Sequence, residues 1–230
     1  MEFEIDKYHL RTTELFESLN PDNLARIKSK LVRKEYEAGE YLFREKSYPK
    51  GIYLVRKGKI KIFQTNAEGR QSIVTIYKKG DYFGHRPLLA EEENPVSAVA
   101  ITSSVLSFLN REEFFYQLDR SPEFSKSLLQ NLSKEFSIWV NKSTVFAQYG
   151  VKARTALSLL ILSEIYQREE NQKNVVININ RDDFAAFVGT AKETLVRMLR
   201  LFKDEGIIKS SGSKITVLKP RALLNIIEAM

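Results

Sequence analysis

The chain of 230 residues is long enough for two domains, and its formal net charge of +7 favours a polyanionic partner. It contains no cysteine, which excludes disulfides, thiolate zinc sites, thiol redox sensing and cysteine-ligated iron–sulfur clusters. Its only two histidines are His9 and His85, and a two-histidine metal site would need both to converge, so a metalloenzyme is disfavoured. No apolar run reaches about eighteen residues and the charged N-terminus predicts no cleavable signal, so we expect a cytoplasmic protein with no cofactor and no membrane association.

The first 32 residues have a helical pattern. Asn20 is a good N-cap, and Pro21 suits the first position of a helix. The apolar side of this helix is formed by Leu24, Ile27, Leu31 and Val32. We expect the segment to cover the domain that follows.

Short strands punctuated by glycine extend from Val32 to about Leu109. Six of the ten glycines fall in this region, mostly seven to twelve residues apart: Gly39, Gly51, Gly58, Gly69, Gly80 and Gly84. Apolar and other residues alternate in 59–63 and 73–77, which gives each strand one inward face. The pattern predicts an antiparallel roll.

Helices follow the predicted roll. A short helix is expected over Glu112 to Leu118, and a long one from Pro122 to about Gln148, with Ser121 as its N-cap. The long helix carries a wide apolar stripe made of Leu128, Leu132, Phe136, Trp139 and Phe146, with Leu129, Val140 and Val145 beside it. This stripe indicates a dimer seam, and the alternative is that it only covers the roll. Gly150 is the natural hinge after the helix.

The region after the hinge has the pattern of a helix-turn-helix. Val151 to Gln167 is apolar nearly all round and predicts a buried supporting helix, and residues 175–179 predict a strand. A first short helix begins after Asn180, with Phe184, Ala185 and Val188 facing inward, and Gly189 supplies a turn. Thr190 and Glu193 predict a capping box that starts a second helix over residues 191–202, whose inward residues are Leu195, Met198, Leu199 and Phe202.

The outer side of the second helix carries Lys192, Glu193, Arg197 and Arg200. Such residue types contact base edges and phosphates, although a solvated face with a Glu193–Arg197 pair is the alternative. Two strands, Ile207 to Lys209 and Lys214 to Leu218, form a wing around a turn over residues 210–213. Eight basic and three acidic residues between Thr190 and Arg221 predict a phosphate-facing surface, and a helical turn follows from Leu223.

Three motifs in this order resemble the CRP/FNR family, the bacterial regulators related to the cyclic-AMP receptor protein. They are Gly39-Glu40-x-Leu42-Phe43, then Ile52-Tyr53-Leu54-Val55-x-x-Gly58-x-Ile60-x-Ile62, then Gly80-Asp81-Tyr82-Phe83-Gly84. The resemblance covers nearly the whole chain, because the winged helix-turn-helix is the other half of the family. It implies an α+β fold with an N-terminal antiparallel β-roll of the cyclic-nucleotide-binding, jelly-roll type in residues 1–120, a dimerisation helix and hinge in 121–149, and a DNA-binding domain in 150–230.

The resemblance places an effector pocket at Gly84, His85, Arg86, Ser97 and Ala98. Cyclic-AMP-binding members have a glutamate for the ribose where this chain has His85, and an arginine for the cyclic phosphate where it has Val96. Because valine cannot neutralise a phosphate, cyclic AMP is not expected to bind. Either another small effector binds here or the pocket is vestigial. A haem or metal ligand role for His85 is disfavoured, since a lone histidine beside Arg86 is more often structural.

For DNA, the resemblance assigns base contacts to Lys192, Glu193 and Arg197. Contacts to the DNA backbone are assigned to Arg181, Thr190, Thr194, Arg200 and Lys214. Lys192 stands where arginine is common and offers a point charge instead of a fork, so its base preference is expected to be looser. The resemblance also implies a dimer paired through the long helix.

We therefore expect a homodimeric transcription regulator, not an enzyme, that binds a near-palindromic double-stranded operator with recognition helices roughly 34 Å apart. A regulator that activates also contacts RNA polymerase, and no residues of the sequence single out that surface. Two other hypotheses remain: a small-molecule-binding module without DNA specificity, and a cupin-like enzyme. The latter is disfavoured because histidine is scarce and residues 80–100 contain no paired acid–base cluster.

Overall fold

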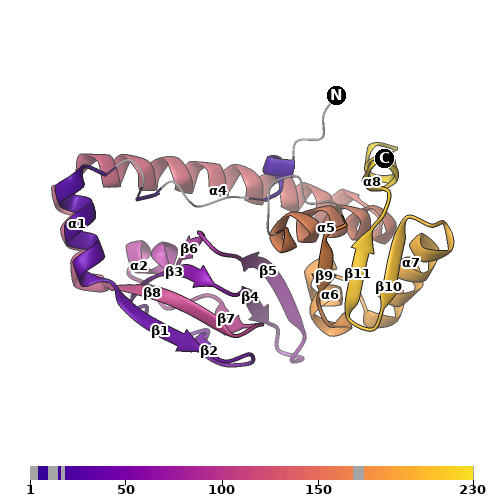
Figure 1. Ribbon diagram of the computed structural model, residues 1–230, viewed down its shortest axis with the longest axis horizontal. Coiled ribbons are helices and arrows are strands. Elements are labelled where there is room, and N and C mark those ends of the chain that lie inside the picture. The colour runs from indigo at the N-terminus through magenta and orange to yellow at the C-terminus, as the bar shows by residue number, and fades with distance from the viewer. Residues whose placement is uncertain (1–4, 10–14, 17–18, 168–173, 230) are drawn as a thin grey trace. The chain divides into compact units, whose positions relative to one another are not determined.

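The computed structural model describes residues 5–9, 15–16, 19–167 and 174–229. The chain forms two compact units (Figure 1). One unit comprises Leu10–Gly69 and Val74–Phe136, and the other comprises Met1–His9, Arg70–Ile73 and Ser137–Met230. No helix within the described ranges has both the length and the apolar composition needed to cross a membrane.

The predicted antiparallel roll is confirmed. Its strands are β1 (Val32–Tyr36), β2 (Tyr41–Phe43), β3 (Gly51–Lys57), β4 (Ile60–Thr65), β5 (Gln71–Tyr77), β6 (Tyr82–Phe83), β7 (Ser97–Ala100) and β8 (Ser104–Asn110). They form two four-stranded sheets, in the orders β1-β8-β3-β6 and β2-β7-β4-β5. Strands β3 and β8 approach so closely that a Cβ on Gly51 would collide with the carbonyl of Leu109, and this position therefore requires glycine.

The interior of the roll is filled largely by aromatic rings. The ring of Phe83 stacks on Tyr77 with centroids 4.9 Å apart and on Tyr53 with centroids 5.4 Å apart. Phe43 packs against both Tyr53 and Phe83. Aliphatic side chains complete this core: Val55, Ile60, Ile62, Ala98, Ala100 and Leu106.

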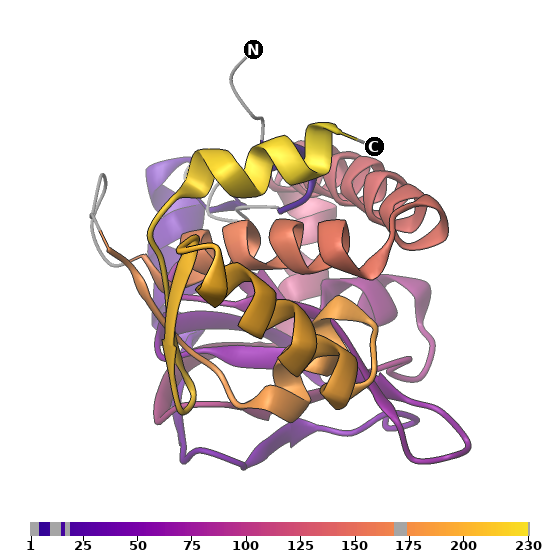
Figure 2. The ribbon, with the colours of Figure 1, turned by 90° about the vertical axis from the view of Figure 1, so that its right-hand side faces the viewer.

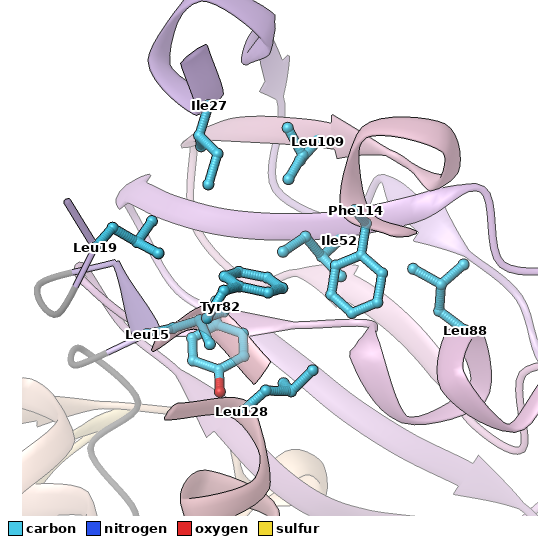
Figure 3. Close-up of a cluster of buried hydrophobic side chains, with 10 residues drawn as sticks. Leu15, Leu19, Ile27, Ile52, Tyr82, Leu88, Leu109, Phe114 and Leu128 are labelled. Atoms are coloured by element: carbon cyan, nitrogen blue, oxygen red, sulfur yellow. The ribbon is translucent and has the colours of Figure 1, made fainter. Parts of the chain in front are cut away.

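A second core joins the roll to four helices, which are α1 (Pro21–Lys30), α2 (His85–Ala90), α3 (Arg111–Arg120) and the beginning of α4 (Pro122–Gln148). Figure 3 shows its side chains converging from these helices, from β3, β6 and β8, and from the segment before α1. They are Leu15, Leu19, Ile27, Ile52, Tyr82, Leu88, Leu109, Phe114, Phe124 and Leu128. Burial of this many large apolar groups fixes the first turns of α4 onto the roll.

The helix predicted in the first 32 residues is only partly correct. Asn20 caps α1 by accepting a hydrogen bond from the N–H of Asn23 at 2.8 Å, and Pro21 occupies the first helical position. Val32, however, lies in β1 opposite Phe108, because a β-branched residue suits the strand that starts there. Its side chain is 55% exposed and is not part of the helix's apolar side. Before Asn20 the described residues contain only short 3₁₀ turns; residues 1–4, 10–14 and 17–18 of the prediction lie outside the described residues.

A buried carboxylate ties α1 to α3. Arg26 donates from Nε and Nη2 to the two oxygens of Glu113 at 2.8 and 2.9 Å, and Gln117 donates to Glu113 at 2.8 Å. Burial by itself would raise the pKa of Glu113, but the hydrogen bonds from Arg26 and Gln117 outweigh it and hold the pKa below its usual value. The ionised form of Glu113 therefore stabilises the fold.

We expect Glu113→Gln to lower the melting temperature at pH 7. Because the folded pKa of Glu113 is depressed, its contribution is complete above the unfolded pKa of about 4.3 and is lost as the pH falls through the folded pKa. The deficit of the variant should therefore shrink below about pH 4. Calorimetry across pH 3–7 measures it, with the exposed neighbour Glu112→Gln as the control. An equal, pH-independent loss in both variants would contradict this role.

The C-terminal unit contains α5 (Val151–Tyr166), β9 (Val176–Asn178), α6 (Arg181–Val188), α7 (Lys192–Asp204), β10 (Ile208–Ser211), β11 (Lys214–Val217) and α8 (Pro220–Glu228). Helix α5 is buried on nearly every side, as its apolar sequence predicts. Helix α8 packs on α5 (Figure 2), and its residues Leu223 and Ile227 are buried. Its function in the fold is thus to cover α5, which the sequence left unassigned.

Candidate functional site

The helix-turn-helix consists of α6 and α7, which pack against one another (Figure 1). Asn180 caps α6 by accepting a hydrogen bond from the N–H of Asp183 at 2.7 Å. Gly189 ends the helix in the left-handed conformation, with φ of 70°, which glycine adopts without strain. The predicted inward residues of α7, namely Leu195, Leu199 and Phe202, are buried, and Met198 is half-buried.

The predicted capping box is wrong. The N-cap of α7 is Ala191, and no side chain caps this helix. The N–H of Thr190 donates instead to the carbonyl of Ala185 at 3.1 Å. Thr190 therefore belongs to the closing turn of α6, and α7 begins one residue later than the pattern indicates.

The outer side of α7 is polar and exposed. Lys192, Glu193, Arg197 and Arg200 are all exposed there. Among the described residues no ion pair joins Glu193 to Arg197, so the solvated-pair alternative loses its main contact. Arg200 lies 3.8 Å from Asp204, too far for a strong pair. The face can therefore present one acceptor and several cationic donors to an outside partner.

The wing has a tighter turn than predicted. Strands β10 and β11 pair from Ser211 opposite Lys214, so the turn contains Gly212 and Ser213 instead of four residues. The backbone of Gly212 is left-handed, which permits this two-residue turn. Strand β9 pairs with β11 as a third strand, and Ser213 donates to the side chain of Asn178 at 2.7 Å. Lys214 is exposed beside the turn.

Arg181 links the helix-turn-helix to the wing. Its Nη2 donates to the hydroxyl of Ser210 at 2.8 Å and to the carbonyl of Gly212 at 2.6 Å. Burial lowers the pKa of Arg181. In this structure the residue predicted to contact the DNA backbone therefore positions the wing.

The residues of the predicted effector pocket separate into two groups. Gly84, with φ of 96°, is the N-cap of α2, and His85 is the first residue of that helix. Ser97 and Ala98 lie in β7, where the hydroxyl of Ser97 accepts a hydrogen bond from the N–H of Glu45 at 3.0 Å and Ala98 is part of the roll interior. Val96 packs against the same apolar interior.

A glutamate on α4 joins the first group, and sequence reasoning missed it. The Nε2 of His85 lies 3.3 Å from one oxygen of Glu135, and Nε of Arg86 lies 3.4 Å from the other. His85 is almost completely buried, with a side chain 1% exposed. Burial would raise the pKa of Glu135, but His85 and Arg86 outweigh it and keep the pKa below its usual value. The sequence did contain a signal for this contact. Phe124, Leu128, Asn131 and Glu135 follow one another at helical spacing, which places Glu135 on the roll-facing side of α4.

The apolar residues of α4 face two ways. Leu128 is buried in the core of its own unit and Leu132 is half-buried. Phe136 and Trp139 are 65% and 59% exposed. Phe146 is also exposed, yet its ring lies against the turn of the helix-turn-helix.

The end of α4 is joined to that turn by Arg154 of α5. Its guanidinium donates to the carbonyls of Phe146 and Gly189, at 3.4 and 3.3 Å. A Cβ at Gly189 would lie 2.9 Å from Cε1 of Phe146. The last turns of α4 and the turn between α6 and α7 therefore form one packed cluster.

We expect Gly189→Ala to destabilise the C-terminal unit by about 1–2 kcal/mol, because alanine is strained at this φ and its Cβ displaces Phe146. Gly212→Ala is the matched control, since its backbone is also left-handed but a Cβ there meets nothing within 4 Å. Urea unfolding of both variants measures the difference. Equal losses would show that only backbone strain, and not Phe146, constrains the turn.

Comparisons with known proteins agree with this architecture. Residues 33–121 match the cyclic nucleotide-binding domain and residues 153–226 match the Crp-like helix-turn-helix domain. The chain is 26% identical over 208 residues to the cyclic AMP receptor protein of Thermus thermophilus, covering 90% of this chain and 94% of that protein. It is 24% identical over 204 residues to a CRP-like cAMP-activated global transcriptional regulator of Mycobacterium tuberculosis, covering 88% and 91%.

Solved structures show the same fold. A transcriptional regulator of the CRP/FNR family from Thermus thermophilus matches with a TM-score of 0.72 and 27% identity, over 86% of this chain and 98% of that one. The c-di-GMP-responsive global regulator CLP of Xanthomonas campestris matches with a TM-score of 0.73 and 18% identity, over 86% and 99%. The roll, the helix-turn-helix and these relatives together show that the chain belongs to the CRP/FNR family of DNA-binding transcription regulators.

Proposed function

We propose that the protein is a homodimer that binds a near-palindromic operator through α7, with residues 1–120 as a sensor, 121–149 as the dimerisation helix and hinge, and 150–230 as the DNA-binding domain. The observation that carries this proposal is the outer face of α7, where Lys192, Glu193 and Arg197 are exposed beside a basic wing. Arginine contacts guanine O6 and N7, glutamate accepts from cytosine N4, and lysine donates to base or phosphate acceptors. Thr190, Thr194, Arg200 and Lys214 would then contact phosphates.

The apolar seam of α4 supports the dimer. Leu129, Leu132, Phe136, Trp139, Ser143 and Phe146 are spaced alternately by three and four residues, the pattern of a coiled-coil seam. Leu129, Phe136 and Trp139 are each more than half exposed in the single chain. Exposed apolar stripes of this kind mark interaction surfaces, and a second copy presents the same stripe. Leu128 faces the core of its own chain, so Leu129 takes its place in the seam.

For the sensor, we propose a small effector other than cyclic AMP. Val96, at the position of the phosphate arginine, packs on the apolar interior, and the carboxylate of Glu135 already lies beside the side chains of His85 and Arg86. Yet in the described part of the chain the side chains of His85 and Glu135 make no hydrogen bond of good geometry. Buried polar groups usually have hydrogen-bond partners, so these two groups favour a bound molecule that would supply them. The relative named for its response to c-di-GMP supports a roll that serves another ligand.

One observation favours the alternative, a regulator with a vestigial pocket. The stacked rings of Tyr53, Tyr77 and Phe83 occupy the interior of the roll, where a ligand would otherwise pack. Such a protein would bind its operator without an effector. We also propose that the protein acts in the cytoplasm, where its DNA target lies, and that it contacts RNA polymerase.

Selection of binding sequences from a random duplex pool tests the function. The protein is expected to enrich a two-fold symmetric site, and added cyclic AMP should not change its affinity for that site. Enrichment without any ligand would favour the vestigial pocket, whereas enrichment only with a cell extract would favour an effector. Failure to enrich any sequence under both conditions would favour a module without DNA specificity.

A further inference from the structure

An ion pair at the start of α7 joins a residue of the proposed DNA-binding face to a residue that has no part in the proposed DNA contacts. The ammonium of Lys192, the first residue of α7, donates to Oδ2 of Asp182 at 2.9 Å. Asp182 is the second residue of α6. The two side chains are 50% and 72% exposed, so the pair contributes little to folding stability. Its geometry instead constrains where the charge of Lys192 lies.

We propose that Asp182 is a specificity-determining residue, which holds Lys192 for a base contact and prevents it from pairing freely with phosphates. This inference rests on the proposed function, in which Lys192 contacts base edges. An ammonium has three N–H donors. One of them is used by Asp182, and the other two remain for acceptors on an operator base pair.

Asp182 can affect specificity because affinity for random DNA and affinity for the operator depend on different contacts. Random DNA is bound almost entirely through phosphates, so each cation that reaches a phosphate adds affinity regardless of sequence. Asp182 holds one such cation, so Lys192 adds less to the affinity for random DNA. At the operator, base acceptors are placed in the major groove, where an oriented Lys192 can meet them without leaving Asp182.

Neighbouring charges do not take this role. Asp183 accepts a hydrogen bond from Asn180 at 2.8 Å and its N–H is bonded to the same cap. Arg181 is committed to Ser210 and Gly212. Asp182 is thus the carboxylate that contacts the ammonium of Lys192. Asp183 carries the same charge at the next position without this contact, and it therefore serves as a control.

The test measures affinity for the selected operator and for random duplex DNA by fluorescence anisotropy over a range of salt concentrations. For Asp182→Asn we expect affinity for random DNA to rise about fivefold, with a salt dependence of log K steeper by about 0.9. Affinity for the operator should change less than about twofold, so the specificity ratio falls. The control Asp183→Asn, with the same change in charge, should leave the ratio unchanged.

A second variant separates this role from a general charge effect. In a Lys192→Gln background, Asp182→Asn should no longer steepen the salt dependence on random DNA. Equal changes on operator and random DNA, or equal behaviour of Asp183→Asn, would overturn the inference while leaving the proposed function intact. A wild-type protein that binds operator and random DNA equally would overturn the proposed function and, with it, this inference.

Discussion

Phe136→Glu is expected to make the protein monomeric and to lower its affinity for the operator by at least about a hundredfold. In the proposed seam Phe136 meets its own copy across the two-fold axis. In that seam the variant would bring two carboxylates together in place of two apolar rings. A monomer holds one half-site only, so the gain from binding both half-sites through one linked molecule is lost.

Sedimentation equilibrium measures the assembly, and anisotropy on the selected operator measures the affinity. Gln130→Glu is the matched control, because residue 130 is exposed on the same helix but lies outside the seam spacing. Since Phe136 is 65% exposed in the single chain, the variant should keep its circular dichroism spectrum. A dimeric Phe136→Glu protein with unchanged affinity would leave the stripe as a cover for the roll.

Arg197→Ala is expected to lower affinity for the operator by about 1–3 kcal/mol and to relax the preference at one G·C pair in each half-site. The guanidinium of Arg197 is exposed, and no hydrogen bond within the described residues competes for it. Its five donors can therefore reach O6 and N7 of guanine together. Affinity for operators substituted at each position measures the loss and where it falls.

Lys214→Ala is the comparison, because a wing lysine held near phosphates should weaken binding to every sequence alike. The Lys214→Ala variant should reduce the slope of log K against log salt concentration by about one and leave the base preferences unchanged. If Arg197→Ala reduces affinity for operator and random DNA equally, Arg197 contacts phosphates and not bases. The base contacts would then depend on Glu193 and Lys192 alone.

Several elements could be predicted because their signals are local. Asn20, Asn180 and Ser121 mark helix starts, and the structure places a helix after each. Glycine spacing and alternation predicted the roll, since turns and one-sided strands require them. The errors also have a local cause: Thr190 and Glu193 match a capping pattern, but the N–H of Thr190 is already used to close α6. A pattern shows what a residue can do, not which of two neighbouring helix ends it serves.

The sequence alone determined the family, the order of its two halves and the residue types on α7, because periodicity and motif order depend on neighbours in the chain. Only the tertiary structure decided which distant groups meet: Glu135 with His85, Asp182 with Lys192, and Arg181 with the wing. Side-chain polar contacts extend only a few ångströms, so their partners depend on how helices and strands pack. The proposed specificity of Asp182 therefore became visible only when α6 and α7 were placed together.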